Sequence, residues 1–420
     1  MSTSVIRGGH LLLPDGRLLR RDLLIEDGLI ASIGVNSRCK DAIDASGCLV
    51  MPGFVNTHTH TPMTLLRGWC EGLRFSEWLE CIWQREAELT PSDIYLGSIL
   101  ACVEMIRSGI TTFADVYIHM DRVALAAGES GLRCVLGWGL LEGAGGEPLE
   151  EKLSERRAFV KKYNHACNGR ITTMYAPHSP VTSSEEALTA LARLSREDGV
   201  PITTHLLESR EEAMALDGSC HHLSRLDRAG LLSNRFLAAH CVHLSDEDAR
   251  ILAERGVSVS LNPISNLRLG VGVPPIEMMA SHGLNLSLGT DGAASGGLLD
   301  IFEVMRTVAL IGRMSGGISP FDILRMATLN GAVALGLETG AIKRGFAADL
   351  ILVDMKKPHL TGCDPISALV HSAKGCDVKT TIVGGEVLME DYVIKTLNEE
   401  DIIERAIERI ADLKNRHAIE

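Results

Sequence analysis

The middle of the chain, from about Met51 to about Gly340, alternates short apolar runs with helical segments. Short continuous apolar runs are typical of parallel strands that are covered on both faces. The helical segments between them begin with N-cap and acidic residues, as at Ser184 and Asp246. Repeated strand–helix units predict a closed (β/α)8 barrel of the TIM type. The candidate strands are Thr111–Ala114, Ile171–Tyr175, Ile202–Thr204, Phe236–Ala239, Val257–Leu261 and Leu284–Leu288.

Both ends of the chain carry hairpin signals instead. Asp27-Gly28 and Gly384-Gly385 are two-residue turns between apolar runs, and Ala348–Asp354 is a further strand candidate. We expect one small β-sandwich domain assembled from both ends, which suits a chain of 420 residues, too long for an ordinary single domain. The expected boundaries are 1–51 plus 345–395 for the sandwich, 52–344 for the barrel and 396–420 for a terminal helix.

Composition excludes several classes of partner. Forty-one Lys and Arg against fifty-four Asp and Glu give a net charge of −13, without any Lys/Arg-rich tract. This argues against binding to nucleic acid or to an anionic membrane. No apolar run approaches the ~18 residues that cross a bilayer, and the first residues do not resemble a signal peptide. We therefore expect a cytoplasmic protein that acts on a small molecule, with formation of a homo-oligomer left open.

The eleven cysteines include no Cys-x-x-Cys pair. In a chain of this size they are expected to be reduced, buried, small hydrophobic residues, and neither a disulfide framework nor a thiolate zinc site.

Several apolar runs end in residues that can bind a metal ion. His58 and His60 follow the first run, and side chains two residues apart in a strand point to the same face. His205, His240 and Asp291 follow three later runs. Each residue alone is a weak indication of metal binding, because strand-end histidines and turn aspartates are common. Together they are expected on one face of the barrel, where the carboxyl ends of the strands meet.

The same runs supply further candidates. Glu208 lies close enough to His205 to carry a proton in the same pocket, whereas Cys241 has apolar neighbours and is expected to be packed. His178 ends another run, which offers no lysine to bridge two metals. The donor set therefore favours one divalent metal ion, with Zn²⁺ the favoured ion and one position open for water. The absence of His-x-Glu and Pro-Cys-x-x-Cys motifs excludes a zinc site of the cytidine-deaminase type.

Taken together, these motifs resemble the amidohydrolase superfamily, and within it the S-adenosylhomocysteine/5′-methylthioadenosine deaminases. The resemblance covers nearly the whole chain. It rests on Pro52–Met63 with Arg67-Gly68, His205-x-x-Glu208, Ala239–Leu244, Asn262-Pro263-x-Ser265-Asn266-Leu267 and Gly289–Ser295.

The resemblance implies a hydrolytic deaminase that converts adenosine or a 5′-substituted adenosine to the inosine analogue and ammonia. Its metal ligands would be His58, His60, His205 and Asp291. Hydroxide on the metal would attack the amino-bearing carbon while Asp291 takes the water proton. Glu208 would protonate the neighbouring ring nitrogen, and His240 would steady the hydroxide.

The resemblance also implies substrate contacts. Glu86 would bind the ribose hydroxyl groups, with Glu88 as the competing choice because the alignment needs a one-residue gap. His178 would contact the base. Trp78, Trp138 and Ser295 complete the expected substrate contacts.

One departure from the family bears on the substrate. Family members carry an arginine where this chain has Trp138, and another in the following loop, where this chain has Glu147 or Pro148. Without those charge partners, each worth about 1.5–3 kcal/mol, a zwitterionic tail binds less well. A small uncharged 5′ group, as in 5′-methylthioadenosine or 5′-deoxyadenosine, is therefore favoured over S-adenosylhomocysteine.

Two other functions stay open on the same scaffold. One is deamination of a free base (guanine-, oxidised-purine- or pterin-like), and the other is hydrolysis of a triazine. Amide hydrolysis and a catalytically inactive binding protein rank lower.

Overall fold

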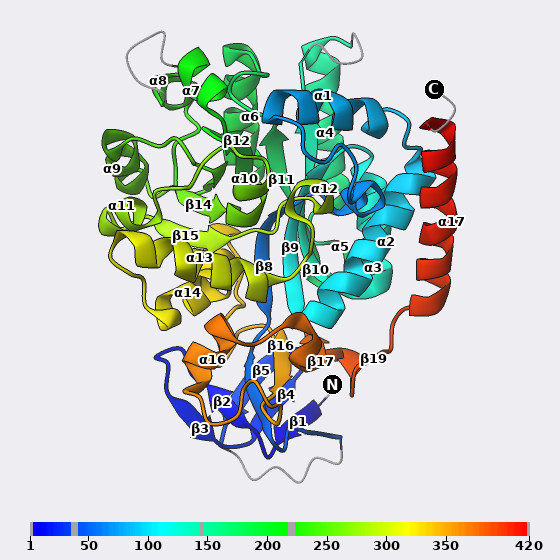
Figure 1. Cartoon of the computed structure of the whole chain (residues 1–420), viewed down its shortest axis with the longest axis vertical. Coiled ribbons are helices and arrows are strands. Elements are labelled where there is room, and N and C mark those ends of the chain that lie inside the picture. The colour runs from blue at the N-terminus through cyan, green and yellow to red at the C-terminus, as the bar shows by residue number, and fades with distance from the viewer. Residues whose placement is uncertain (1–2, 35–40, 143–146, 217–222, 418–420) are drawn as a thin grey trace.

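Eight parallel strands form the centre of the molecule (Figure 1). The computed structural model describes residues 3–34, 41–142, 147–216 and 223–417. The two end strands are joined by hydrogen bonds from Thr57 Oγ1 to Leu288 O (2.9 Å) and from the Asp291 N–H to His58 O (3.0 Å), so the sheet curves round into a barrel. The strands, which follow chain order across the sheet, are β8 Phe54–Thr59, β9 Ile110–Tyr117, β10 Arg133–Leu140, β11 Ile171–Pro177, β12 Ile202–Leu206, β13 Phe236–His240, β14 Ser258–Leu261 and β15 Asn285–Leu288.

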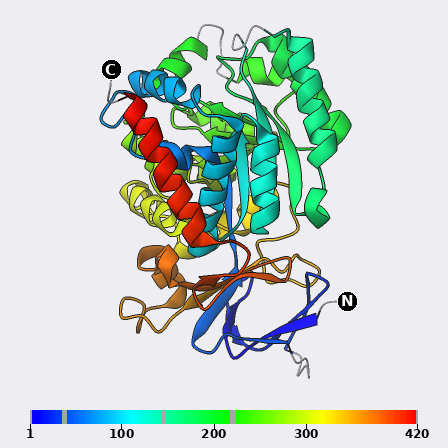
Figure 2. The ribbon, with the colours of Figure 1, turned by 90° about the vertical axis from the view of Figure 1, so that its right-hand side faces the viewer.

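Helices cover the outside of this barrel (Figures 1 and 2). Their ends follow from local chemistry: the Ser184 hydroxyl accepts the Ala187 N–H at the start of α6, and Gly199 closes that helix at a φ of 68°. The helices are α1 Phe75–Glu86, α2 Pro91–Ser108, α3 Met120–Ser130, α4 Leu149–Tyr163, α5 Ala166–Gly169, α6 Glu185–Asp198, α7 Arg210–Leu216, α8 Ser224–Ala229, α9 Asp246–Glu254, α10 Pro263–Arg268, α11 Ile276–Ser281, α12 Ala293–Gly296, α13 Ile301–Ser315, α14 Pro320–Met326, α15 Leu329–Ala334, α16 Pro365–His371 and α17 Glu399–His417, with short 3-10 turns at η1 Thr61–Leu66 and η3 Gly375–Asp377.

Inside the barrel, side chains fill two layers. Val55, Val135, Met174 and Leu237 form an apolar layer that also receives residues from α15. A polar layer lies between the β8, β14 and β15 strands, where the Thr57 hydroxyl lies 2.7 Å from that of Ser260 and 3.0 Å from that of Ser287. The interior is thus a packed core, and the space for a ligand is left to the ends of the strands.

Two smaller sheets lie at the opposite end of the molecule from α1 and α7 (Figure 1). They share one apolar core, to which β1, β7, β16 and β17 all contribute, so they form a sandwich built from both ends of the chain. The first sheet has the order β5-β4-β1-β6 and the second β19-β18-β17-β16-β7-β2-β3. Their strands are β1 Thr3–Arg7, β2 His10–Leu12, β3 Leu18–Arg20, β4 Leu23–Glu26, β5 Leu29–Ile33, β6 Ala42–Asp44, β7 Cys48–Pro52, β16 Leu350–Asp354, β17 Val378–Val383, β18 Glu386–Glu390 and β19 Val393–Ile394.

Together with the barrel, this sandwich confirms the predicted fold class; the residue boundaries between domains stay a prediction. A single residue, Gly53, separates β7 of the sandwich from β8 of the barrel. A Cβ at this position would lie 2.1 Å from Thr111 Cγ2, so only glycine lets the chain pass directly from one sheet to the other.

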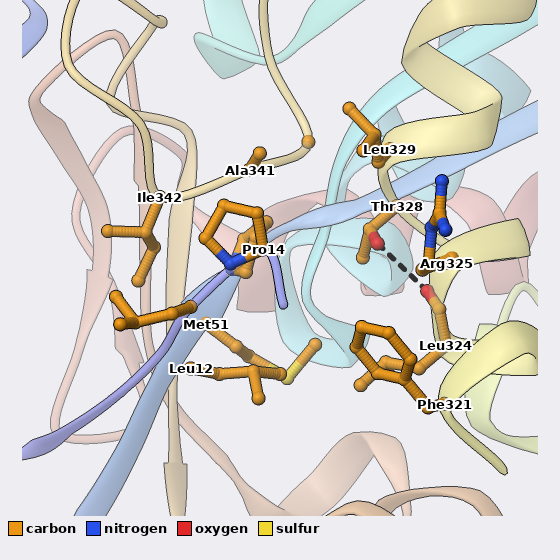
Figure 3. Close-up of a pocket in the computed structure, with 13 residues that line it drawn as sticks. Leu12, Pro14, Met51, Phe321, Leu324, Arg325, Thr328, Leu329, Ala341 and Ile342 are labelled. Carbon is orange, nitrogen blue, oxygen red and sulfur yellow. Dashed lines mark hydrogen bonds between the residues drawn. The ribbon is translucent and has the colours of Figure 1, made fainter. Parts of the chain in front are cut away.

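A cavity of about 30 Å³ lies where the sandwich meets the barrel (Figure 3). Leu12, Met51 and Phe321 line it together with Thr328, whose hydroxyl donates to Leu324 O at 2.8 Å. Its volume holds about two water molecules. Its lining is mostly apolar and includes none of the residues predicted for catalysis.

The predicted terminal helix is present as α17, which packs against α2 (Figure 2). Arg409 of α17 makes two parallel hydrogen bonds to the buried Asp93 of α2, at 2.6 and 2.9 Å. Among the described residues, no single helix is long and apolar enough to cross a membrane. Within that same part of the chain, α1 and α2 pass the test of length and composition as a pair, but they are bent by 115° at the break between them.

The expectation that all cysteines are reduced and buried is wrong. Cys70 and Cys81 form a disulfide that ties α1 to the segment after η1. Cys167, Cys363 and Cys376 are exposed free thiols, whereas Cys241 is buried as predicted. The pairing depends on how α1 folds back over the barrel, which Cys spacing alone does not reveal; Cys39 and Cys220 lie outside the described residues.

Candidate active site

Three histidines from two strands gather at the carboxyl end of the barrel. His58 lies in β8, His60 follows its last residue and His205 lies in β12. Their ring centroids are 4.8 to 5.4 Å apart, and one nitrogen of each ring lies within 4.8 Å of the others. The same-face prediction for His58 and His60 agrees with this geometry, because alternate strand residues project to one side.

The hydrogen bonds of these rings show which nitrogens face the cluster. The Nδ1 atom of His60 lies 2.6 Å from Val116 O, and that of His205 lies 2.7 Å from His178 O. A carbonyl oxygen only accepts, so each Nδ1 donates a proton and each neutral ring keeps its lone pair on Nε2. Those Nε2 atoms lie 3.3 Å apart, and the buried His58 Nε2 has no hydrogen-bond partner. Lone pairs held this close repel unless a cation lies among them, so the donors fit a divalent metal ion.

Asp291 completes this donor set from beyond β15. Its Oδ1 atom lies 3.4 Å from His60 Nε2 and 3.8 Å from His58 Nε2. Its backbone is left-handed (φ 61°) and is held by the Thr59 hydroxyl, which donates to Asp291 O at 2.9 Å. Burial raises the pKa of Asp291, but the surrounding imidazoles, led by that of His60, outweigh burial and hold it well below its usual range.

Glu208 and His240 lie beside the donor set. Glu208 Oε1 is 3.5 Å from His240 Nδ1, and atoms of Glu208, His240 and Asp291 all lie within 4.8 Å of one another. Burial, with contributions from Asp291 and Glu212, raises the pKa of Glu208 well above its usual value, so this carboxyl group can hold a proton. Burial lowers the pKa of His240 to about 3, which keeps the ring neutral.

The orientation of His240 depends on a residue to which no role was assigned from the sequence. The side-chain amide of Asn266 lies 2.9 Å from His240 Nδ1, while the buried His240 Nε2 has no partner. With Asn266 Nδ2 donating to Nδ1, the proton of the ring lies on Nε2. Asn266 stands in the Asn262–Leu267 motif of the sequence, which was the available signal.

His178 and Glu86 lie next to the histidine cluster. The ring of His178 is 4.9 Å from that of His205, and its Nδ1 lies 3.0 Å from the Thr182 hydroxyl. Burial lowers the pKa of His178 to about 3 and keeps it neutral. Glu86 ends α1 beside the Tyr117 hydroxyl and within electrostatic reach of His60, and burial raises its pKa.

The two candidate glutamates lie in different surroundings. The competing residue, Glu88, pairs with Arg85 at 3.5 Å and lies within reach of Arg409, away from the histidines. Trp83, which was not predicted from the sequence, lies 6.1 Å from the His178 ring and is 40 % exposed.

In the part of the chain that the structure describes, three residues expected to contact the substrate do not touch the histidine–aspartate cluster. They are Trp138, Trp78 and Ser295. The ring of Trp138 lies 5.9 Å from Phe159 and under the Arg156 guanidinium at 4.9 Å, both on α4. Strand alternation turns Trp138 outward, while its neighbours Gly137 and Gly139 occupy the inward positions.

Trp78 and Ser295 are buried elsewhere. Trp78 shares with Ile82 the inner face of α1 and belongs to the apolar core. The Ser295 hydroxyl donates to Gly292 O at 3.2 Å, within the turn after Asp291. Trp78 thus supports the helix that carries Glu86, and Ser295 supports the turn that carries Asp291.

Imidazoles and a carboxylate gathered at the strand ends of a (β/α)8 barrel are typical of barrel enzymes that use a metal ion for hydrolysis. A profile of the amidohydrolase family matches residues 49–388, and the chain belongs to this metal-dependent family. The predicted superfamily is thereby confirmed.

Named relatives cover nearly the whole chain. A 5′-deoxyadenosine deaminase from Methanosarcina mazei is 47 % identical over 99 % of each chain. A 5-methylthioadenosine/S-adenosylhomocysteine deaminase from Pyrococcus furiosus is 40 % identical over 97 % of this chain and 100 % of its own. The crystal structure of an adenosine deaminase from Xanthomonas campestris with bound zinc superposes with a TM-score of 0.93 at 27 % identity, covering 98 % of each chain.

Proposed function

We propose that this protein is a hydrolytic deaminase of adenosine or a 5′-substituted adenosine, releasing the inosine analogue and ammonia. The observation that carries the proposal is the adjacency of two groups of side chains. Three imidazoles and Asp291 suit a metal ion, and Glu208 and His240 stand within 4.8 Å of Asp291 with a proton available for the substrate. The activities named for the relatives support this assignment.

One divalent ion, Zn²⁺ by preference, would be held by His58, His60, His205 and Asp291. Imidazole and carboxylate donors in this number suit zinc with a position left for water. When bound, the ion lowers the pKa of a water molecule toward 7 and so supplies hydroxide at neutral pH.

The side chains of this protein move the protons. Asp291 accepts the proton of the attacking water, since its carboxylate is ionised and lies beside the donor nitrogens. His240 directs its Nε2 proton toward the attacking oxygen, held there by Asn266. Glu208 delivers a proton to the ring nitrogen next to the amino-bearing carbon, which makes that carbon electrophilic. Asp291 then passes the proton it accepted to the amino group, which leaves as ammonia, and the remaining hydroxyl proton returns to Glu208 as the carbonyl of the inosine product forms.

Glu86 and His178 would place the nucleoside. A carboxylate accepts two hydrogen bonds and therefore suits the two ribose hydroxyl groups. Glu86 lies beside the Tyr117 hydroxyl and within electrostatic reach of His60, and the ring of His178 lies 4.9 Å from that of His205, so both proposed contacts border the histidine cluster.

The 5′ group is proposed to be small and uncharged. The position of the family's first arginine holds Trp138, whose ring is turned toward α4. The neighbouring Arg156 forms an ion pair with Glu155 at 2.7 Å and donates a hydrogen bond to Gly139 O at 3.3 Å. Glu142 is bonded to the Ser184 N–H, so an acidic group borders this loop.

Steady-state kinetics across a panel of substrates tests the proposal. We expect kcat/KM for 5′-deoxyadenosine and 5′-methylthioadenosine to exceed that for S-adenosylhomocysteine by at least about 10-fold, because a missing charge partner costs about 1.5–3 kcal/mol. Adenine, guanine and triazines serve as the comparison set. Turnover of a free base or triazine in preference to every nucleoside would refute the assignment, and preference for S-adenosylhomocysteine would refute the 5′ selectivity.

A further inference from the structure

The turn that carries Glu208 contains a residue in an unfavourable backbone conformation. Glu208 lies two residues beyond β12, and the intervening Leu207 has a left-handed backbone with φ 50°. That conformation is costly for a residue with a side chain, so it persists only where surrounding contacts fix it. The Leu207 carbonyl is one such contact, since it accepts the His243 N–H at 3.0 Å.

A second contact comes from Glu212 in the first turn of α7. Its Oε2 atom accepts the backbone N–H of Glu208 at 3.0 Å. Its own N–H donates to the hydroxyl of the buried Ser209 at 3.1 Å, as in a helix-capping interaction. In the usual capping box the third helical residue reaches back to the N-cap, whereas Glu212 reaches one residue further and so holds Glu208 itself.

The surroundings of Glu212 distinguish it from its neighbour on the same helix. Burial raises its pKa to about 7, although the backbone N–H groups of Glu208 and Leu207 act in the opposite direction. Glu211, one residue earlier, is exposed to solvent. A buried carboxyl group is costly unless it makes hydrogen bonds. Here Glu212 Oε2 accepts the Glu208 N–H, while the buried Oε1 has no hydrogen-bond partner among the described residues.

We propose that Glu212 is a positioning residue, which fixes the turn after β12 through the Glu208 N–H and thereby aims the Glu208 carboxyl group at the substrate. This inference rests on the proposed function, in which Glu208 protonates the base. Glu212 itself touches neither substrate nor metal. Its effect should therefore fall on kcat, because misplacement of an acid by about 1 Å can cost about 100-fold in rate.

Matched variants distinguish a positioning role of Glu212 from an effect of its charge or of its packing. Glu212→Gln keeps an oxygen that accepts the Glu208 N–H, while Glu212→Met has a similar length and cannot accept it. Glu211→Gln makes the same chemical change at the exposed neighbour. Each full-length, zinc-loaded variant is assayed for kcat and KM with 5′-deoxyadenosine, and hydrogen–deuterium exchange is measured over residues 205–212.

We expect Glu212→Met to lose about 100-fold in kcat, with little change in KM and faster exchange across the turn. Glu212→Gln should recover most of the rate and the protection, and Glu211→Gln should match the unaltered protein. Low kcat in Glu212→Gln, or normal kcat and exchange in Glu212→Met, would overturn the proposal. Because the glutamine variant is nearly isosteric, low kcat or loss of protection in it would overturn the proposal even if the methionine variant does not fold. If the unaltered protein deaminates no nucleoside, the proposed function fails, while the exchange comparison still tests the role of Glu212.

Discussion

Asp291 has two tasks in the proposed reaction, as a metal ligand and as the acceptor of the water proton. The variant Asp291→Asn keeps the size of the side chain but removes the basic oxygen. We expect kcat to fall by at least about 1000-fold, with an unchanged circular dichroism spectrum, because the backbone contacts to Thr59 and His58 remain. Appreciable residual turnover in a folded variant would remove Asp291 from the role of base.

The effect of replacing Glu86 distinguishes a nucleoside deaminase from a free-base deaminase. Replacing it by glutamine weakens the contact with the ribose, since hydrogen bonds to a charged group are worth about 1.5–3 kcal/mol. We expect KM for 5′-deoxyadenosine to rise by at least about 10-fold with a smaller effect on kcat. Glu88→Gln is the matched control, because Glu88 pairs with Arg85 instead. Equal effects of the two changes would remove Glu86 as the ribose contact.

At the residue scale, the sequence predicted the groups whose position follows from a strand. His58, His60, His205, His240 and Asp291 each follow an apolar run, and the carboxyl ends of parallel strands meet at one face. The partners of Asn266 and Tyr117 lie on other elements of the barrel, so the Asn262–Leu267 motif marked Asn266 without revealing its contact with His240, and Tyr117 was not singled out. The expected role of Trp138 came from an alignment position, and strand alternation turns its side chain toward α4, so its substrate contact stays a prediction.

At the scale of elements, α17 is secured by one buried ion pair. Arg409→Met leaves Asp93 buried without its partner, and loss of one member of such a pair is expected to cost about 3 kcal/mol at pH 7. Arg405→Met is the matched control on the same helix. Its pair with Asp401 is exposed, so about 0.5 kcal/mol is expected. Chemical denaturation of the two variants measures both differences in the free energy of unfolding.

The cost of Arg409→Met should depend on pH in a defined direction. Burial raises the pKa of Asp93, but hydrogen bonds from Arg409 and Thr90 outweigh it, so the folded-state pKa is lower than the ordinary 3.8. The stabilisation is therefore complete above the ordinary value and is lost as the pH falls through the lower folded-state value. Unfolding measured from pH 7 to pH 3 should show the difference between Arg409→Met and the unaltered protein shrinking. A difference that grows on acidification would contradict this ion-pair account.

Helix positions were predicted better than helix contacts. Ser184 and the residues before Asp246 mark helix starts through capping chemistry, which is local and can be found in a sequence. The Cys70–Cys81 disulfide and the Arg409–Asp93 pair join segments whose approach depends on the folded barrel. The sequence offers no short-range signal for either of them.

At the scale of the whole molecule, chain order explains both the predicted architecture and the location of the site. Alternating strand and helix patterns predict a parallel barrel, and hairpin signals at both ends predict the sandwich that β7 and β16 complete. The direct passage from β7 through Gly53 into β8 anchors the strand that carries His58 to the sandwich. Removal of the sandwich is therefore expected to disturb the active site, although the two lie at opposite ends of β8.

The central claim is that one metal ion in the histidine–aspartate cluster makes this protein a deaminase. The most direct measurement is metal removal by chelation, followed by stepwise return of Zn²⁺ while deamination of 5′-deoxyadenosine is recorded by ultraviolet absorbance. We predict that chelation abolishes turnover and that activity returns linearly and saturates at one ion for each chain. Full activity in the metal-free protein, or a requirement for a second ion, would contradict the account.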